Sequence, residues 1–408
     1  HARETALEVA KLYGASVVLG SATPSLEAYY RAGRGEYRLF QLTKRLTGGE
    51  LPTVYTVDLR QELQEGNRSI FSRKLQELMT DRLNKGQQTI LFLNRRGYAG
   101  FVSCRSCGEV MKCPHCDVSL SEHKGGRLIC HYCGYTQPMP KLCPKCGSKY
   151  ILGFKAGTQQ IEEKLKELYP GVRTLRMDAD TTRTKDSYEK ILSSFANGEA
   201  DVLIGTQMIV KGHDFPKVTL VGILAADLSL NASDYRAGER TFQLLTQAVG
   251  RAGRGVLPGE AVIQTYQPDH YAITCAAAQD YESFYQEEIL YRELSGYPPV
   301  AHMLAVQIYG KEEENVKQLA LRLTDVVKSN MDFLSGKQKE QSNKKIQVLG
   351  PAPANISKIN DIYRYVFYVK HAEYDVLVEV KDRLEETLRQ WQPRQMSIQF
   401  DFDPVSVL

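Results

Sequence analysis

The residues with the clearest chemical capacity are cysteines, and they are concentrated in one short segment. Eight of the nine cysteines lie between Cys104 and Cys146, in four C-x-x-C pairs written CRSC, CPHC, CHYC and CPKC. A zinc ribbon uses two such pairs separated by about 12 to 20 residues, because four thiolates close one tetrahedral site. Disulfides are the alternative, but a reducing compartment favours metal binding. The ninth cysteine, Cys275, stands alone in AITCAAAQ and is predicted to be a small core residue.

The spacing of the four pairs favours two nested sites over two sequential ones. Thirteen residues separate Cys116 from Cys130, which fits a ribbon, whereas only five separate Cys107 from Cys113. Sequential pairing stays the alternative. Both sites are predicted to be closed and structural, since eight thiolates fill two tetrahedra. The predicted ligands are Cys113, Cys116, Cys130 and Cys133 for the inner site, and Cys104, Cys107, Cys143 and Cys146 for the outer site.

A second group of residues, in TQAVGRAGRG (246–255), is suited to binding phosphate. Arg251 and Arg254 stand three residues apart between glycines, after a run whose apolar residues recur at helical spacing. Arginine binds phosphate through two parallel hydrogen bonds, so this segment predicts a phosphate ligand. Yet neither GK dipeptide of the chain belongs to a phosphate-binding loop. Paired arginines on a helix are, taken alone, more often a solvated surface.

Together with TQAVGRAGRG, four further stretches are predicted to lie where strands end, which is where open α/β sheets bind ligands. They are VVLGSATPS, FLNRRGYA, AGTQQIEEKL and IGTQMIVKGHDF, and the third opens a helix whose N–H groups suit a phosphate. Each is weak by itself, since a tripeptide such as SAT after a strand is usually a helix cap. Their candidate residues are Ser21, Thr23, Arg95, Thr158, Thr206, Gly212 and Asp214.

A parallel α/β sheet is needed to position these stretches. Up to about residue 280, short apolar runs alternate with runs of helical periodicity, a pattern typical of a parallel sheet covered on both faces. The strand candidates are SVVLGS, TVYTVDL, QTILFLN, VRTLRMD, ADVLIGT, VTLVGIL and AVIQTY. The cysteine segment, residues 99–150, interrupts this pattern after QTILFLN and is therefore predicted to be an insertion in an α/β domain.

The order of elements changes after residue 297. A strand, a helix, two strands, a helix and a strand follow one another, and this βαββαβ order predicts a ferredoxin-like α+β domain over 297–408. The polar tract SGKQKEQSNKK, residues 335–345, is predicted to be a loop.

Length and charge set only broad limits. A chain of 408 residues predicts about two to four domains, and a net charge of +4 is too small to indicate nucleic acid. No apolar run reaches the roughly 18 residues that a membrane span needs. We therefore expect a soluble cytoplasmic protein with no membrane partner.

In this order, the motifs resemble those of superfamily 2 helicases, and more closely those of the bacterial primosomal replication-restart helicases. GSATPSLEAY resembles motif III, LFLNRRGYA motif IV, GTQMIVKGHDFPKVTLVGILAAD motif V and ERTFQLLTQAVGRAGR motif VI. An eight-cysteine insertion directly after motif IV separates this family from other helicases. The resemblance covers essentially the whole chain, and it implies a RecA-like helicase lobe with an inserted double zinc ribbon and a ferredoxin-like C-terminal domain.

The resemblance implies an ATP-dependent DNA helicase with 3′ to 5′ polarity, which recognises stalled or repaired replication forks and initiates primosome assembly. Its cofactors would be two structural Zn²⁺ ions, and ATP with Mg²⁺. Its partners would be forked and single-stranded DNA, the single-stranded DNA-binding protein, and the primosome and helicase-loading proteins. A monomer is expected.

The resemblance also implies catalytic roles for named residues. Arg254 is the expected arginine finger, Arg251 a second contact to the γ-phosphate, and Gln247 the residue that positions the attacking water. Ser21 and Thr23 are expected to couple phosphate loss to movement between two motor lobes.

The remaining site residues are expected to bind rather than to react. Gly212 and Asp214 would face the nucleotide, while Arg95, Thr158 and Thr206 would hold the backbone of single-stranded DNA.

One departure from the family pattern matters. The family's phosphate-binding loop and its acidic Mg²⁺-binding motif precede motif III, and this sequence has no D-E-x-H. We therefore expect the C-terminal part of a longer protein, without the N-terminal DNA-binding domains and most of the first motor lobe, and inactive as an ATPase by itself. The expected parts are a first-lobe remnant over 1–70, the second lobe over 71–98 and 151–296, the zinc insertion over 99–150, and the C-terminal domain over 297–408.

Two other functions stay open at this stage. The chain could be a zinc-dependent scaffold that binds DNA or protein without its own ATPase activity. RNA instead of DNA as the substrate is a third possibility, which only the family resemblance disfavours.

Overall fold

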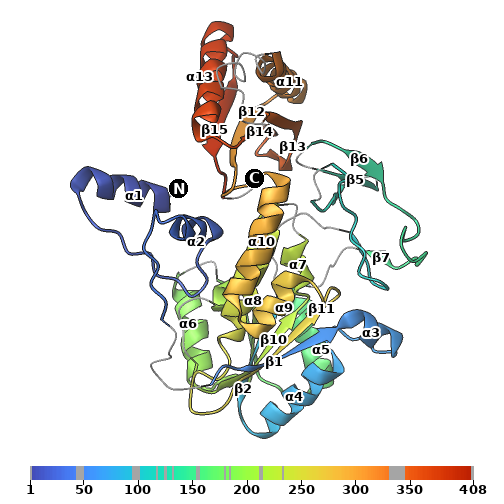
Figure 1. Ribbon diagram of the computed structural model, residues 1–408. Coiled ribbons are helices and arrows are strands. Elements are labelled where there is room, and N and C mark those ends of the chain that lie inside the picture. The colour runs from blue at the N-terminus through green and yellow to red at the C-terminus, as the bar shows by residue number, and fades with distance from the viewer. Residues whose placement is uncertain are drawn as a thin grey trace. The chain divides into compact units, whose positions relative to one another are not determined.

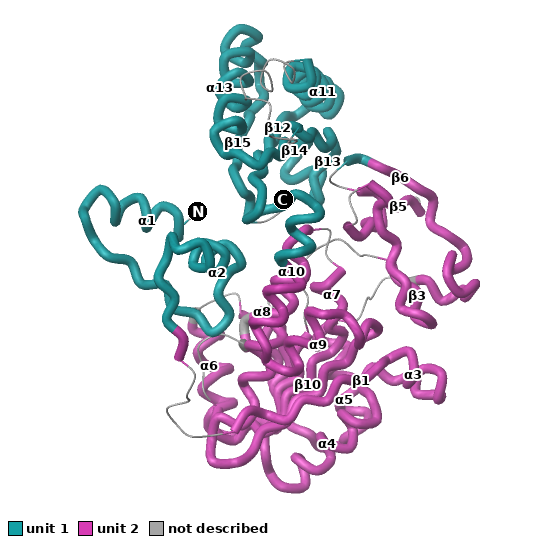
Figure 2. The backbone as a smooth tube through the Cα atoms, in the orientation of Figure 1, with its two compact units in different colours: residues 1–40, 132–134, 289–408 teal, residues 41–131, 135–288 magenta. Residues whose placement is uncertain are grey.

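The computed structural model describes most of the chain in two compact units, which Figure 2 distinguishes by colour. Unit 1 contains residues 1–40, 132–134 and 289–408, and unit 2 contains residues 41–131 and 135–288. The described residues are 2–42, 50–93, 102–115, 118–123, 126–130, 133–152, 157–178, 181–182, 185–210, 215–231, 234–329 and 345–405. Among them, no helix has both the length and the apolar character needed to span a membrane.

Unit 2 is built on a six-stranded sheet in which every neighbouring pair is parallel (Figure 1). Its strand order is β1-β11-β10-β2-β9-β8. All residues of β2 and β10 are buried, as expected for central strands covered on both faces. The strands are β1 (Thr53–Asp58), β2 (Gln88–Leu93), β8 (Thr174–Met177), β9 (Val202–Gly205), β10 (Val218–Leu224) and β11 (Glu260–Thr265). Six of the seven expected strands are therefore confirmed.

Helices cover this sheet because their apolar residues recur on one side. In α4 and α5, Leu75, Met79, Ile161 and Leu165 pack in one buried cluster with strand residues such as Leu91. The helices of this unit are α3 (Leu59–Gln64), α4 (Arg73–Asn84), α5 (Thr158–Leu168), α6 (Lys185–Ala196), α7 (Asp227–Leu230), α8 (Ala237–Val249), α9 (Tyr271–Ala278) and most of α10 (Tyr281–Ser295), with a 3-10 turn at Gln207–Val210.

One glycine allows α4 to approach the centre of the sheet. A Cβ atom built on Gly222, in β10, would lie 2.8 Å from Leu75 Cδ1 and 2.8 Å from Leu91 Cδ2. Real Cβ atoms do not approach other carbons so closely, so a larger residue at this position would force the buried side chains of Leu75 and Leu91 to shift.

Two expectations for the first 70 residues are wrong. The stretch SVVLGS (16–21) forms no strand, and Val18 is 93% exposed. A strand needs a hydrogen-bonded neighbour, and no described strand pairs with this stretch. In addition, β1 lies within the residues that we assigned to a first lobe, yet Thr53–Asp58 pairs with Glu260–Thr265 in the sheet of unit 2. The sheet domain therefore begins before residue 71.

The C-terminal part of unit 1 has the expected ferredoxin-like arrangement. Its antiparallel strands lie in the order β13-β14-β12-β15, and α11 and α13 contribute to one core with them. The elements are β12 (His302–Gly310), α11 (Glu313–Ser329), β13 (Gln347–Ile359), β14 (Ile362–His371), α13 (Tyr374–Trp391) and β15 (Met396–Phe402). Most of the tract that we predicted to be a loop, 335–345, lies outside the described residues. Unit 1 also holds α1 (Ala2–Tyr13) and α2 (Leu26–Gly33).

The strands that the structure describes in the cysteine segment are very short. In it, β3 (Ser103–Cys104) pairs with β7 (Ile151–Leu152), while β4 (Ser121–His123), β5 (Arg127–Ile129) and β6 (Thr136–Pro138) form a second small sheet. Strands of two or three residues bury little apolar surface. Another source of stability is therefore required here.

We expect Leu75→Ala to lower the free energy of unfolding of unit 2 by about 2 to 5 kcal/mol, because this fully buried side chain would leave a cavity between α4 and Gly222. Leu168→Ala is the matched control, since Leu168 is 42% exposed and its loss should change stability by about 0.5 kcal/mol or less. Denaturant unfolding followed by circular dichroism measures both. Equal losses for the two variants would contradict the packing described here.

Candidate metal centre and candidate phosphate-binding residues

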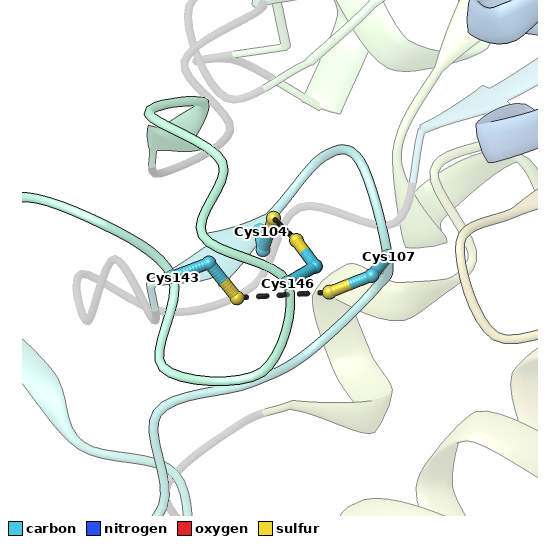
Figure 3. Close-up of side chains that lie close together, drawn as sticks. All are labelled: Cys104, Cys107, Cys143 and Cys146. Atoms are coloured by element: carbon cyan, nitrogen blue, oxygen red, sulfur yellow. Dashed lines mark hydrogen bonds between the residues drawn. The ribbon is translucent and has the colours of Figure 1, made fainter.

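Four cysteines from both ends of the cysteine segment come together in one cluster. The Sγ atoms of Cys104, Cys107, Cys143 and Cys146 all lie within 4.8 Å of one another, and Figure 3 shows the side chains pointing inward. Cys104 Sγ lies 3.6 Å from Cys146 Sγ, and Cys107 Sγ lies 3.6 Å from Cys143 Sγ. None of the four is in a disulfide. This is the outer set of the nested arrangement, and not the sequential one.

The geometry of this cluster fits a zinc ion. A tetrahedral site with Zn–S bonds of about 2.3 Å places its sulfur atoms about 3.8 Å apart. The observed separations of 3.6 Å are close to that value. A set of four thiolates is also the donor set that selects zinc over the hard cations.

Two similar turns present these cysteines. In the first, the backbone N–H of Gly108 donates to Cys104 O over 2.8 Å, and in the second Gly147 N–H donates to Cys143 O over 2.9 Å. Both glycines have left-handed backbones, with φ of +77° and +70°. Glycine adopts this conformation without steric cost. We did not single out these residues from the sequence, although the pattern C-x-x-C-G marks both of them.

The electrostatics of the cluster favour a thiolate at one position. Burial raises the pKa of Cys104, but hydrogen bonds from the backbone N–H groups of Cys107 and Ser106 and from the thiols of Cys146 and Cys107 together lower the pKa to about 7. A partly ionised thiol is ready to bind a cation, because the thiolate is the form that coordinates metal.

The inner set is described in part. The Sγ atoms of Cys113, Cys130 and Cys133 lie within 4.8 Å of one another. Cys116, the predicted fourth ligand, lies outside the described residues. The three thiols come from both pairs of the predicted inner ribbon, so their proximity also agrees with nesting. Cys275 is outside both groups.

Two of the candidate threonines lie at the carboxyl edge of the sheet in unit 2. Thr158 is the first residue of α5, and its hydroxyl donates to Asp178 Oδ2 over 2.6 Å. Thr206 follows β9, and its N–H donates to Met177 O over 3.3 Å. Met177 ends β8 and Asp178 follows it, so both threonines are bonded to the same strand end. The third predicted backbone contact, Arg95, lies outside the described residues.

Asp178 is a residue that we missed in the sequence. Burial raises its pKa, but hydrogen bonds from Thr158 and from the N–H of Thr181, together with the charge of Arg176, lower the pKa below its usual range. Arg176 Nε lies 3.1 Å from Asp178 Oδ2. The carboxylate is therefore ionised at neutral pH. Its position as the last residue of the strand candidate VRTLRMD was the available signal, since polar residues at strand ends are candidates for function.

The arginine segment, residues 246–255, lies at the opposite side of the sheet, where the strands have their amino ends. Gly253, with φ of +67°, donates its N–H to Val218 O, at the amino end of β10. A Cβ atom on Gly255 would lie 2.6 Å from Pro216 O. We had grouped TQAVGRAGRG with stretches that follow strands, and this is wrong, because α8 carries it back past the amino end of β10. Arg251 and Arg254 lie in this segment, at the end of α8.

The arginine segment contacts the middle of motif V, at Pro216 and Val218. Pro216 comes shortly after Gly212 and Asp214, and these two residues lie outside the described residues. Gln247 is exposed on α8, one turn before the glycines. Arg254 Nε donates to Gly250 O over 2.8 Å, so its guanidinium is held at the C-terminal end of the helix, where a positive charge is favourable.

Ser21 and Thr23 belong to unit 1, and the arginine segment belongs to unit 2. Thr23 is buried, and its N–H donates to Ser21 Oγ over 3.1 Å. The helix cap of this stretch is Ser25, which accepts from Ala28 N–H. The role of Ser21 and Thr23 in coupling phosphate loss to lobe movement stays a prediction.

Three family models match the chain. They are described as the primosomal protein N C-terminal domain (residues 293–405), the PriA DNA helicase Cys-rich region domain (113–138) and the helicase conserved C-terminal domain (142–256). Together with the fold and the cysteine cluster, they define the C-terminal RecA-like lobe of a helicase, with a Cys-rich zinc region and a separate antiparallel-sheet domain.

Relatives extend this match over the whole length of the chain. The replication restart protein PriA of Bacillus subtilis is 44% identical over 410 residues, which is 100% of this chain and 50% of the relative. Its counterpart in Synechocystis sp. is 41% identical over 100% of this chain and 48% of the relative. The chain belongs to the PriA family of replication restart helicases. It spans about half the length of these curated relatives.

A solved structure of S. cerevisiae Dbp5 bound to RNA and ADP BeF3 also matches. It is 13% identical with a TM-score of 0.33, over 69% of this chain and 55% of that chain. A score at this level carries no argument about function.

We expect the purified chain to contain about two zinc ions, because its eight cysteines in C-x-x-C pairs are sufficient for two closed sites of four thiolates each. Cys104→Ser should lower the zinc content to about one per chain, and so should Cys113→Ser, which removes a ligand of the inner site while leaving the α/β sheet folded. Cys275→Ser is the matched control and should keep both ions. Elemental analysis with circular dichroism measures these outcomes. A content of one zinc or none in the unaltered chain would contradict the prediction.

Proposed function

We propose that this chain is the second motor lobe, zinc region and C-terminal domain of an ATP-dependent DNA helicase that unwinds with 3′ to 5′ polarity. The observation that carries the proposal is the arginine segment, which is fixed by glycine contacts at the amino end of β10. In this proposal, residues 53–98 and 151–296 form the lobe. ATP and Mg²⁺ bind between this lobe and a second lobe that supplies the phosphate-binding loop.

The arginine segment suits the stabilisation of charge on a phosphate. Hydrolysis of ATP in such motors depends on positioning and on charges that meet the developing negative charge of the γ-phosphate. Gly253 N–H donates to Val218 O, and Arg254 Nε donates to Gly250 O. In this proposal, the two hydrogen bonds fix the position of the Arg254 side chain before the nucleotide binds. We assign Arg254 as the finger, Arg251 as a second γ-phosphate contact and Gln247 as the residue that positions water.

Other residues take supporting roles in this proposal. Gly212 and Asp214 face the nucleotide, and Ser21 and Thr23 couple phosphate loss to lobe movement. Arg95, Thr158 and Thr206 hold the backbone of single-stranded DNA. The threonines and the arginines lie at opposite edges of one sheet. Nucleic-acid and nucleotide contacts are therefore separate within the lobe.

The names of the relatives support the cellular role. We propose that the full-length protein acts as a monomer in the cytoplasm, recognises stalled or repaired forks, and assembles the primosome with the single-stranded DNA-binding protein and helicase-loading proteins. The cysteine clusters favour structural zinc, because the four thiolates of the outer cluster leave no open coordination position. They also support a second function, in which the zinc region is a scaffold for protein partners. Both functions are compatible.

In a full-length protein that carries this chain, we expect Arg254→Ala to lower the rate of DNA-stimulated ATP hydrolysis at least about a hundredfold, because the γ-phosphate loses its fixed counter-charge. Arg254→Lys should restore little of the rate, since an ammonium group cannot make two parallel hydrogen bonds. Binding of forked DNA and the Tm should be unchanged.

Arg173→Ala is the matched control for this experiment. Arg173 is a surface arginine of the same unit, paired with Asp201, and its loss should leave ATP turnover unchanged. If Arg254→Ala instead abolished DNA affinity at low salt and spared turnover, the arginines would be a clamp on the DNA backbone.

We expect the chain by itself to show no DNA-stimulated ATPase activity, because it has no phosphate-binding loop to receive the β- and γ-phosphates. Release of inorganic phosphate, measured with and without forked DNA, checks this against the full-length protein. Comparable turnover by the chain alone would show that its catalytic residues are assigned wrongly. Zinc-dependent binding of partner proteins without any turnover would support the scaffold function.

A further inference from the structure

The end of β8 joins two segments that the sequence separates by almost fifty residues. Thr158, at the start of α5, is bonded to Asp178, and Thr206, after β9, is bonded to Met177. We infer that Asp178 is a positioning residue for nucleic-acid binding, which holds Thr158 in register with Thr206. This inference rests on the proposed function, in which both threonines contact single-stranded DNA.

Both carboxylate oxygens of Asp178 are engaged. Oδ2 accepts the hydroxyl of Thr158 over 2.6 Å and lies 3.1 Å from Arg176 Nε. Oδ1 accepts the N–H of Thr181 over 3.0 Å, and the N–H of Asp178 donates to Thr181 Oγ1 over 2.9 Å. The carboxylate therefore cannot rotate without losing a hydrogen bond. The first residue of α5 is held against the end of β8 as a result.

The other half of the junction depends on a close backbone approach. A Cβ atom on Gly205 would lie 2.6 Å from Met177 O and 2.8 Å from Ile209 Cγ2. With glycine at this position, the end of β9 approaches β8 closely enough for Thr206 N–H to donate to Met177 O over 3.3 Å. Two successive residues of one strand end, Met177 and Asp178, thus set the separation of the two threonines.

The hydrogen bonding also decides which groups of Thr158 are left for a ligand. Its hydroxyl proton is directed at Asp178, so the hydroxyl does not serve as a donor to phosphate in this arrangement. The N-cap residue Gly157 makes no side-chain cap, and backbone N–H groups are the usual phosphate donors at a helix start. Asp178 therefore acts on DNA through Thr158 and not by contact, and Arg176 offsets its charge.

If Asp178 positions Thr158, its removal should change DNA affinity in the opposite direction from the removal of a carboxylate that acts through its charge alone. Removing a carboxylate near a polyanion should strengthen binding, whereas removing a positioning group should weaken it. Asp186 is an exposed carboxylate in the first turn of α6, so Asp186→Asn is the matched control for charge. Asp178→Asn keeps an acceptor for the Thr158 hydroxyl and tests rescue.

The experiment uses the full 408-residue chain and a fluorescein-labelled oligothymidylate, with affinity measured by fluorescence anisotropy. We expect Asp178→Ala and Thr158→Val each to raise Kd about tenfold, and the double variant to raise it no further, because both remove the same interaction. Asp178→Asn, Thr158→Ser and Asp186→Asn should stay within about threefold of the unaltered chain.

Several outcomes would overturn this inference. Tighter or unchanged DNA binding by Asp178→Ala would overturn it. So would a Kd of the double variant that rises by the product of the two single increases. If Asp178→Ala does not fold, as judged by its Tm, the comparison of Thr158→Ser with Thr158→Val decides, and equal affinities would count against the inference. Failure of the unaltered chain to bind oligothymidylate, or binding to oligouridylate only, would instead overturn the proposed DNA function.

Discussion

Hydrogen bonding between β2 and its two neighbours, β9 and β10, is the interaction on which the rest of unit 2 depends. The partners come from far along the chain, because the cysteine segment and two helices lie between β2 and β9. All three strands are buried, so their backbone N–H and C=O groups need one another as partners. Because β8 in turn pairs with β9 in parallel, the carboxyl ends of β8 and β9 lie together, and Met177 and Asp178 can bond both threonines.

The same sheet separates two kinds of candidate chemistry. The threonines follow strands and lie at its carboxyl edge, whereas α8 returns the chain to the amino end of β10 and leaves the arginine segment there. A glycine is needed at each of these two positions, for a different physical reason. Gly205 lets two strand ends approach, and Gly253 adopts a left-handed backbone in the turn after α8. In the proposed function, nucleotide and nucleic acid would therefore bind at opposite ends of the strands of one sheet.

The cysteine segment follows a different physical rule from the sheet that it interrupts. Its strands have two or three residues, too few for an apolar core of the size that stabilises a domain. Thiolate clusters held by C-x-x-C-G turns can supply this stability, because binding of zinc to such sites is coupled to folding. Zinc binding can thus stabilise the insertion without apolar residues from the core of the α/β lobe around it.

Local pattern in the sequence was sufficient for most of the strands and for the grouping of the outer cysteines. Periodicity identified six strands of the parallel sheet and the βαββαβ order, and cysteine spacing favoured the nested pairing that Cys104, Cys107, Cys143 and Cys146 show. These predictions needed only residue types and their spacing along the chain. Tertiary structure alone decided that SVVLGS lacks a strand partner, that β1 joins the sheet of the lobe, and that the arginine segment lies at the amino end of β10. It also decided that Asp178 receives the hydroxyl of Thr158, since strand partners and buried hydrogen bonds come from residues far apart in sequence, and a local pattern cannot specify them.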